Sequence, residues 1–264
     1  MRKKGICILK NEFLNLLIDA DMYAFRITSA SKEEVMWDEH TVSAYLDMDK
    51  TKASFTNALE TLEEKVKGAF KIPATTPTKF YLCFTDPDDN FRKHLLPSYK
   101  ENRSGKGKPL GYWPLVDWIK KKYPHVICKK GLEADDCIGI LATSLPNTIM
   151  CSGDKDFKSI PGRFFDIIHE EPYTITEDEA NYFHLYQTLI GDTADNYKGC
   201  PGIGPVTAHR ILSSNPTWEA VRDTFALKGL SEEDALLQAR VARILRDTDV
   251  DNNYKPILWK PSKN

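Results

Sequence analysis

The stretch Phe13-Leu-Asn-Leu-Leu-Ile-Asp19 is a short apolar run that ends in an aspartate, and the same arrangement returns twice. The later examples are Lys79-Phe-Tyr-Leu-Cys-Phe-Thr-Asp86 and Asn147-Thr-Ile-Met-Cys-Ser-Gly-Asp154. Apolar runs of this length, bounded by polar or turn residues, predict buried strands. If these strands are parallel, their carboxyl ends share one edge of a sheet, where α/β folds place their sites.

Three aspartates at one sheet edge predict a bound cation. Like charges at close range repel each other strongly, so such a cluster needs a positive partner. Carboxylate oxygens suit Mg²⁺ or Mn²⁺. We therefore expect metal-ion chemistry, with phosphate as the substrate group.

The rest of the chain predicts an α/β protein with a mostly parallel sheet. Further strand candidates cover residues 125–129 and 163–168, and they alternate with helix-like segments at 54–70, 111–122 and 134–144. After about residue 175 the pattern becomes helical, with capping boxes at Thr176-Glu-Asp-Glu179 and Ser231-Glu-Glu-Asp234. We expect an α/β core over residues 1–175 and a helical region over 176–264.

The net charge is only −2, which weakly argues against a bulk nucleic-acid binder. The charges are, however, unevenly distributed along the chain. Between residues 92 and 108 there are six basic residues and one acidic residue. They lie in a segment, 86–111, that has no clear period and is rich in Pro and Gly. A loop of this length is a solvated surface excursion, a disordered stretch or a functional element.

The cysteines and the hydropathy pattern predict a cytoplasmic protein. None of the six cysteines forms a C-x-x-C pair, so free thiols are expected rather than disulfides or zinc. Polar residues interrupt the apolar segment behind the basic start, which argues against a signal peptide. No stretch approaches 18 apolar residues, so no membrane span is expected.

Three further groups of acids follow predicted strands or helices. They are Glu133, Asp135 and Asp136; Asp154 and Asp156; and Asp192 and Asp195. Acids at a helix N-terminus complement its dipole, and Asp-x-Asp after a strand is common in turns, so both have ordinary explanations. The last pair sits at a predicted helix C-terminus, where acids oppose the dipole, and this favours a ligand role.

Gly202-Ile203-Gly204 followed by Pro205 predicts a tight turn into a helix with Pro at its first position. Exposed amides of such a turn bind phosphate without reading sequence. The carbonyls of the turn are candidates for binding a monovalent cation such as K⁺.

Taken together and in this order, the motifs resemble the 5′-nuclease family of flap endonucleases, polymerase-I 5′-nuclease domains and phage 5′→3′ exonucleases. The segments Pro97-Ser-Tyr-Lys-Glu-Asn-Arg103 and Tyr254-Lys-Pro-Ile-Leu-Trp259 are similar to the phage exonuclease branch in particular. The resemblance covers nearly the whole chain.

The resemblance implies a PIN-like or resolvase-like α/β nuclease core joined to a helix–three-turn–helix DNA-binding region, which is helix-hairpin-helix-like. It also implies two Mg²⁺ or Mn²⁺ ions that drive phosphodiester hydrolysis. The carboxylates carried over as metal ligands, some acting through water, are Asp19, Asp86, Glu133, Asp135, Asp136, Asp154, Asp156, Asp192 and Asp195.

The resemblance implies that the basic segment forms an arch over the 5′ strand. Lys100 and Arg103 match residues that counter charge on the scissile phosphate, and with Asp135 and Asp154 they are the expected catalytic residues. Tyr99 is expected to stack on a terminal base. The expected DNA contacts outside the turn at Gly202, Ile203 and Gly204 are Arg26, Arg92, Lys93 and Tyr99.

One position departs from some relatives, because Gln187 stands where they carry a lysine, and this puts a phosphate contact in doubt. The resemblance implies a 5′→3′ exonuclease on double-stranded DNA that releases 5′-phosphorylated products, with flap cleavage and primer removal from RNA–DNA hybrids. If phage-encoded, it would act in the host cytoplasm, and no obligate protein partner is evident. A flap endonuclease, a PIN-type ribonuclease and a catalytically silent DNA-structure binder are the alternatives, and Gly202-Ile-Gly204 disfavours the ribonuclease.

Overall fold

The computed structural model describes residues 13–103, 105 and 107–261. Cys7 and Lys106, which entered the predictions as a free thiol and as part of the basic segment, lie outside the described residues. None of the helices in the described part combines the length and the apolar composition that a membrane crossing requires. The cysteines at 83, 128, 137, 151 and 200 are free thiols, and all of these except the exposed Cys128 are buried, as predicted for free thiols.

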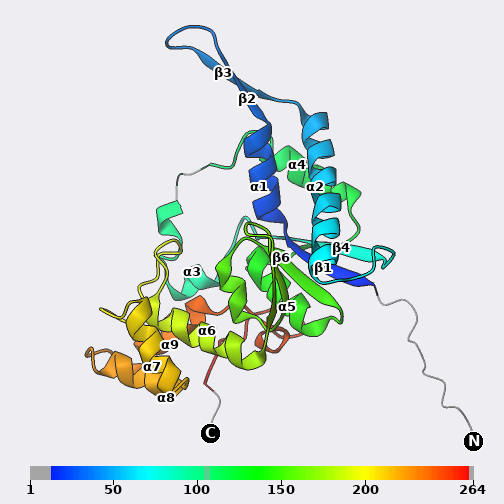
Figure 1. The fold of residues 1–264 in the computed structure, drawn as a ribbon. Coiled ribbons are helices and arrows are strands. Elements are labelled where there is room, and N and C mark those ends of the chain that lie inside the picture. Colours follow the sequence, from blue (N-terminus) through cyan, green and yellow to red (C-terminus); the bar gives the residue numbers. More distant parts are fainter. Residues whose placement is uncertain (1–12, 104, 106, 262–264) are drawn as a thin grey trace, which may run out of the picture.

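A six-stranded sheet in the order β5-β4-β1-β6-β7-β8 forms the centre of the fold (Figure 1). Neighbouring strands are parallel except for the β7–β8 pair. The predicted strands and the parallel sheet are confirmed, whereas β8 was not predicted. The strands are β1 (Leu14–Asp19), β4 (Thr78–Phe84), β5 (Val126–Cys128), β6 (Thr148–Ser152), β7 (Gly162–Asp166) and β8 (Glu171–Ile175).

Alternate residues of β1 enter two hydrophobic clusters on opposite faces of the sheet. Leu16 and Ile18 belong to a cluster with three helices, and Leu17 belongs to the cluster on the other face. The first face is covered by α1 (Ala20–Ser31), α2 (Met48–Ala69) and α4 (Tyr112–Lys122), and the second by α5 (Ala134–Ser144) (Figure 1). Burial on both faces explains why the strand is a continuous apolar run.

Two segments between these elements contain structure that the sequence analysis did not predict. A hairpin of β2 (Lys32–Met36) and β3 (Val42–Leu46) extends away from the sheet beyond α1 and α2 (Figure 1). The basic segment is not a structureless loop, because it contains α3 (Phe91–Leu95) and the 3-10 turn η1 (Glu101–Arg103).

The helices α6 (Glu177–Ile190), α7 (Pro205–Ser214), α8 (Trp218–Ala226) and α9 (Glu232–Ala242) pack around a cluster of their own. The two predicted capping boxes are present at the starts of α6 and α9. After α9 the chain returns to the sheet, where Ile244 and Leu245 join the cluster under α5. Short 3-10 turns, η2 (Lys155–Ser159) and η3 (Asp247–Asp249), complete the described elements. The boundary proposed at residue 175 stays a prediction.

Candidate nuclease active site

β1 and β6 are neighbouring strands of the sheet, and an aspartate lies at or just after the carboxyl end of each. Asp19 caps α1 and accepts a hydrogen bond from the Met22 amide at 3.1 Å. Asp154 caps η2 and accepts from the Asp156 amide at 2.9 Å. Ser152 lies between them, since its hydroxyl is 3.4 Å from Asp19 Oδ2 and accepts from the Asp154 amide. Both carboxylates are therefore fixed at one edge by the turns that follow their strands.

Asp135, in the first turn of α5, reaches the same region. Burial, together with the charges of Asp19 and Asp154, raises the pKa of Asp135 well above its ordinary range. Burial raises the pKa of Asp19 to about 6, and the charges of Asp21 and Asp154 add to the rise. The acids therefore repel one another.

A second group of acids continues from Asp154. Burial and the charges of Asp154 and Asp192 raise the pKa of Asp156 to about 7. Partial burial and the charges of Asp195 and Asp192 raise the pKa of Asp154. The acids of η2 and those of the loop after α6 are thus electrostatic neighbours. Acids that are distant in the sequence therefore lie near one another, and their roles as metal ligands stay predictions.

Asp192 and Asp195 lie in a loop whose two ends, Gly191 and Gly199, approach each other closely. We call this loop, residues 191–199, the acidic ring. A Cβ on Gly191 would lie 2.4 Å from the Lys198 carbonyl carbon, and one on Gly199 would lie 2.3 Å from the Gly191 nitrogen. Both glycines also have positive φ, which side chains rarely adopt. Inside the ring, Asp192 accepts from the Asp195 amide at 3.2 Å. The close approach of Gly191 and Gly199 therefore fixes the loop that carries both carboxylates.

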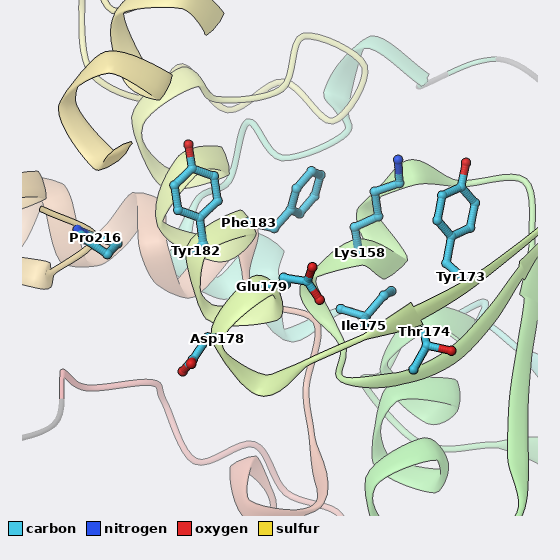
Figure 2. Close-up of a pocket in the computed structure, with 9 residues that line it drawn as sticks. All are labelled: Lys158, Tyr173, Thr174, Ile175, Asp178, Glu179, Tyr182, Phe183 and Pro216. Atoms are coloured by element: carbon cyan, nitrogen blue, oxygen red, sulfur yellow. The ribbon is translucent and has the colours of Figure 1, made fainter. Parts of the chain in front are cut away.

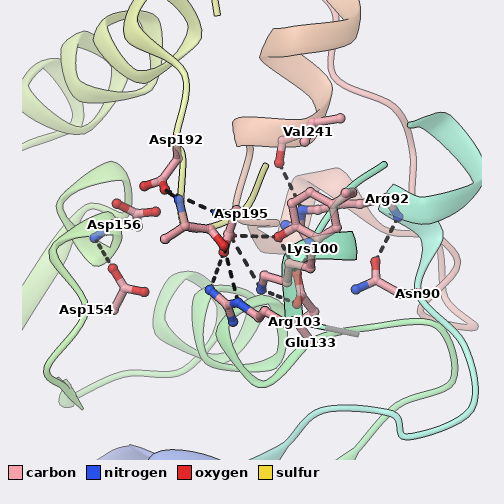
Figure 3. A network of polar contacts seen from close by, with 12 residues as sticks. Asn90, Arg92, Lys100, Arg103, Glu133, Asp154, Asp156, Asp192, Asp195 and Val241 are labelled. Carbon is pink, nitrogen blue, oxygen red and sulfur yellow. Dashed lines mark hydrogen bonds and ion pairs between the residues drawn. The ribbon is translucent and has the colours of Figure 1, made fainter. Parts of the chain in front are cut away.

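Two cations of the basic segment face these acids (Figure 3). Lys100 Nζ pairs with Glu133 and lies 3.4 Å from Asp195 Oδ2. Arg103 pairs with the other oxygen of Asp195. Burial alone would raise the pKa of Glu133, but Lys100 and Arg92 lower it to about 2. The predicted catalytic cations thus lie beside the predicted ligands.

Arg92 and Asp136 correct two predictions. Arg92 was expected to contact DNA, but only 2 % of it is exposed, and its guanidinium forms two bonds of 2.7 Å to Asp136. Asp136, expected as a metal ligand, is fully buried and also accepts from the Leu245 amide. Because Arg92 also donates to the Val241 carbonyl, the pair joins α3, α5 and the end of α9. Both side chains are structural.

The prediction that Tyr99 stacks on a terminal base is wrong for this conformation, because only 2 % of Tyr99 is exposed. Its hydroxyl donates to Glu133 at 2.9 Å and to Asp195 at 3.0 Å.

Asp86 accepts from the Gly131 amide at 2.7 Å and so holds the loop before α5. Its metal role stays a prediction.

Asp21 and Tyr112 were missed by the sequence analysis. Asp21 Oδ2 accepts from the Thr85 amide at 2.8 Å, and its other oxygen accepts from the Tyr112 hydroxyl. The pair thereby ties the start of α4, which follows the basic segment, to the sheet edge. The Asp-x-Asp spacing of Asp19 and Asp21 after a strand was the signal that could have identified it.

The remaining predicted DNA contacts lie at the surface, and their roles stay predictions. Arg26, on α1, and Lys93, on α3, are exposed. Gly202 and Gly204 are exposed, and Ile203 between them is half-buried. Gln187, by contrast, is 3 % exposed on α6, so it offers no phosphate contact here.

The donor set fits hard divalent cations, although the side chains do not yet enclose one. Among the described residues, no three Asp, Glu, His or Cys side chains converge as a finished metal site. Asp156 Oδ1, however, is buried without a hydrogen-bond partner. An unpaired buried carboxylate oxygen beside other acids is costly unless a cation satisfies it. All-oxygen donors match Mg²⁺ or Mn²⁺.

A separate cavity of about 480 Å³ lies between β8 and α6, with Lys158 of η2 in its lining (Figure 2). Its lining is mostly apolar and includes Tyr173, Tyr182 and Phe183. Such a lining does not suit a phosphodiester backbone, so the carboxylate region is the candidate active site.

Comparison with known proteins agrees with this geometry. Residues 15–183 match the family model for the 5′–3′ exonuclease N-terminal resolvase-like domain. The chain is 29 % identical to an exonuclease of Escherichia phage T7, with 93 % of each chain covered. It is 27 % identical to an exodeoxyribonuclease of Enterobacteria phage T3, covering 93 % of this chain and 92 % of the relative.

Among solved structures, the fold is similar to a bacteriophage T5 flap endonuclease variant in a pseudo-enzyme–product complex with DNA and metal ions. The TM-score is 0.61 at 16 % identity, and 89 % of each chain is covered. The chain belongs to the 5′–3′ exonuclease family, and its enzymatic class is that of a 5′–3′ nuclease, a hydrolase. The predicted family and fold class are confirmed.

Proposed function

We propose that this protein is a divalent-metal-dependent 5′→3′ exonuclease that hydrolyses double-stranded DNA from its 5′ end and releases 5′-phosphorylated products. The observation that carries the proposal is the juxtaposition of repelling carboxylates with Lys100 and Arg103. The acids supply a cation site, and the two basic side chains supply a phosphate site next to it.

The acids divide into two groups for two cations, as in two-metal hydrolysis. Two bound cations would activate water and neutralise charge that develops on the phosphate. Since magnesium retains several waters, some carboxylates would act through water. The first group is Asp19, Asp86, Glu133 and Asp135, and the second is Asp156, Asp192 and Asp195. Asp154 would lie near both cations.

The basic side chains would orient the scissile phosphate. Lys100 and Arg103 are paired with Glu133 and Asp195 in the free protein. A phosphodiester anion competes for the same cations, because charge-assisted hydrogen bonds to phosphate are strong. Lys100 and Arg103 would then hold the non-bridging oxygens and offset the charge that grows on them.

The duplex would be held away from the chemistry by the turn before α7. Gly202 and Gly204 are exposed in the turn that begins α7, and their amides suit a phosphate, whereas the Ile203 amide donates to the Cys200 carbonyl at 3.1 Å. The turn carbonyls are candidates for K⁺. Lys93 and Arg26 would add electrostatic contacts to the backbone. These contacts read no bases, which suits a nuclease that starts at any 5′ end.

A flap endonuclease that acts mainly on branched DNA is the second candidate, and the fold shared with the T5 enzyme favours it. Product lengths from a 5′-labelled flap, a nicked duplex and an RNA–DNA hybrid separate the two activities. Short 5′ products from the nicked duplex, lost in chelator and in Asp135→Asn, are expected. Cleavage only at the base of the flap would favour the alternative, and cleavage in chelator would exclude both.

A further inference from the structure

Two asparagine side chains tie the basic segment to the acidic ring. Asn102 Nδ2 donates to the Thr193 carbonyl at 3.0 Å and to the Ala194 carbonyl at 3.3 Å. Asn196 Nδ2 donates to the Ser98 carbonyl at 2.7 Å. Each asparagine therefore binds the main chain of the other segment, and the two bonds form a reciprocal pair that we call the asparagine clasp.

The asparagine clasp brackets Lys100. Lys100 has φ 55°, in the left-handed region that side chains other than glycine rarely adopt. Such a conformation persists only where the surroundings fix it. The Lys100 amide donates to the Asp195 carbonyl at 2.8 Å, and Ser98 and Asn102 are bound on either side of it. The direction of the Lys100 side chain therefore depends on contacts with the acidic ring.

We propose that Asn102 and Asn196 are positioning residues for the nuclease reaction. They hold Lys100 and Arg103 against Asp195, so that the two cations and the second group of carboxylates reach the phosphate as one unit. Neither amide carries a charge, so neither neutralises the phosphate. Their effect passes through Lys100 and Arg103. This inference rests on the proposed nuclease function.

Two variants and one matched control test the asparagine clasp. Asn102→Ala removes an exposed amide, and Asn196→Gly keeps the backbone freedom that φ 59° requires while removing the other. Glu101→Ala changes an exposed residue in the same turn. In single-turnover cleavage of a 5′-labelled duplex with Mg²⁺, each clasp variant should be about tenfold slower, the loss expected for one or two hydrogen bonds. Duplex affinity measured in chelator should equal that of the unmodified protein for each clasp variant, and thermal denaturation should show that each variant stays folded at the assay temperature. The Glu101→Ala rate should equal that of the unmodified protein.

A double-mutant cycle shows whether Asn102 acts through Lys100. In a Lys100→Ala background, Asn102→Ala should slow cleavage by less than about threefold, because only the part of the effect that passes through Arg103 remains. An equal loss in both backgrounds would overturn the positioning role, as would unchanged rates in both single variants. In these outcomes the unmodified protein still cleaves and the nuclease function stands. An unmodified protein that shows no metal-dependent cleavage would instead refute the nuclease function and the clasp together.

Discussion

Lys100 and Asp195, far apart in the sequence, meet through both main chain and side chain. The Lys100 amide donates to the Asp195 carbonyl at 2.8 Å, and Lys100 Nζ lies 3.4 Å from Asp195 Oδ2. Glu133 shares the same ammonium group. The basic segment, α5 and the loop after α6 therefore converge on one cation, which places a phosphate-binding charge beside the proposed metal ligands.

Replacing Lys100 should impair the chemical step more than DNA binding. Lys100→Ala removes a charge aimed at the scissile phosphate, and single-turnover cleavage should fall by about 100-fold or more. Duplex affinity in chelator should change by less than about threefold, because other basic residues still contact the backbone. A loss confined to affinity would reject this role for Lys100.

Replacing Arg92 should destabilise the protein. Arg92→Ala leaves the fully buried Asp136 without its partner, which should cost about 3–5 kcal/mol in urea denaturation. Lys93→Ala, one residue further on and exposed, is the matched control. It should leave stability unchanged and reduce the salt dependence of DNA binding by about one ion. If Arg92→Ala kept full stability but lost DNA affinity, the original interpretation of Arg92 would be restored.

The metal-free protein should lose stability as the pH rises. Aspartates in an unfolded chain titrate near pH 4, whereas Asp19 and Asp156 titrate at about 6 and about 7 in the fold. Because the pKa values of these two aspartates are higher in the folded protein than in the unfolded chain, their protonation stabilises the fold. This contribution to stability is complete below about pH 4 and disappears as the pH rises through about 7.

Thermal denaturation in chelator should therefore show a Tm that falls between about pH 5 and pH 8, and Mg²⁺ should raise it again at the higher pH. Asp156→Asn should flatten the pH profile and increase the metal-free Tm at about pH 8 by several degrees. A profile identical to that of the unmodified protein would show that Asp156 does not carry this charge.

A bulky residue at Gly204 should weaken duplex binding without unfolding the turn. A Cβ at this position meets nothing within 4 Å and the backbone φ is −97°, so a side chain can leave the backbone here without strain. Gly204→Leu would obstruct a phosphate at the helix start. Duplex affinity should fall by about tenfold or more, roughly the loss of one charge-assisted hydrogen bond. Cleavage of short single strands should persist. Gly68→Ala, also unobstructed and on α2, is the control. Equal losses on both substrates would argue against a role in holding the duplex.

The sequence predicted the sheet and the aspartates at its strand ends because local patterns encode them, whereas the roles of the site residues came from the resemblance and stay predictions. Apolar runs that end in Asp19 and Asp154 mark strand ends, and parallel pairing brings those ends together. The direction of a basic side chain is not local. Arg92 and Lys93 are adjacent, but only Arg92 turns inward, because Asp136 meets it from α5. Such long-range pairing leaves no signal in the sequence around Arg92.

The same limit explains the assignment of Asp136. Asp135 and Asp136 are consecutive in the first turn of α5, so their side chains leave the helix in different directions. Both residues are aspartates in the sequence, but Asp135 lies near Asp19 and Asp154, whereas Asp136 is paired with Arg92. The β2–β3 hairpin escaped prediction because its residues are exposed and show no alternation of apolar and polar positions.

The most direct test of the central claim is a crystal structure of the protein soaked in Mn²⁺, with the ions located by anomalous scattering. Two peaks are expected, one among Asp19, Asp135 and Asp154, and one among Asp156, Asp192 and Asp195, as two-metal hydrolysis requires. Binding of Mn²⁺ elsewhere on the molecule, with these carboxylates bare, would contradict the account.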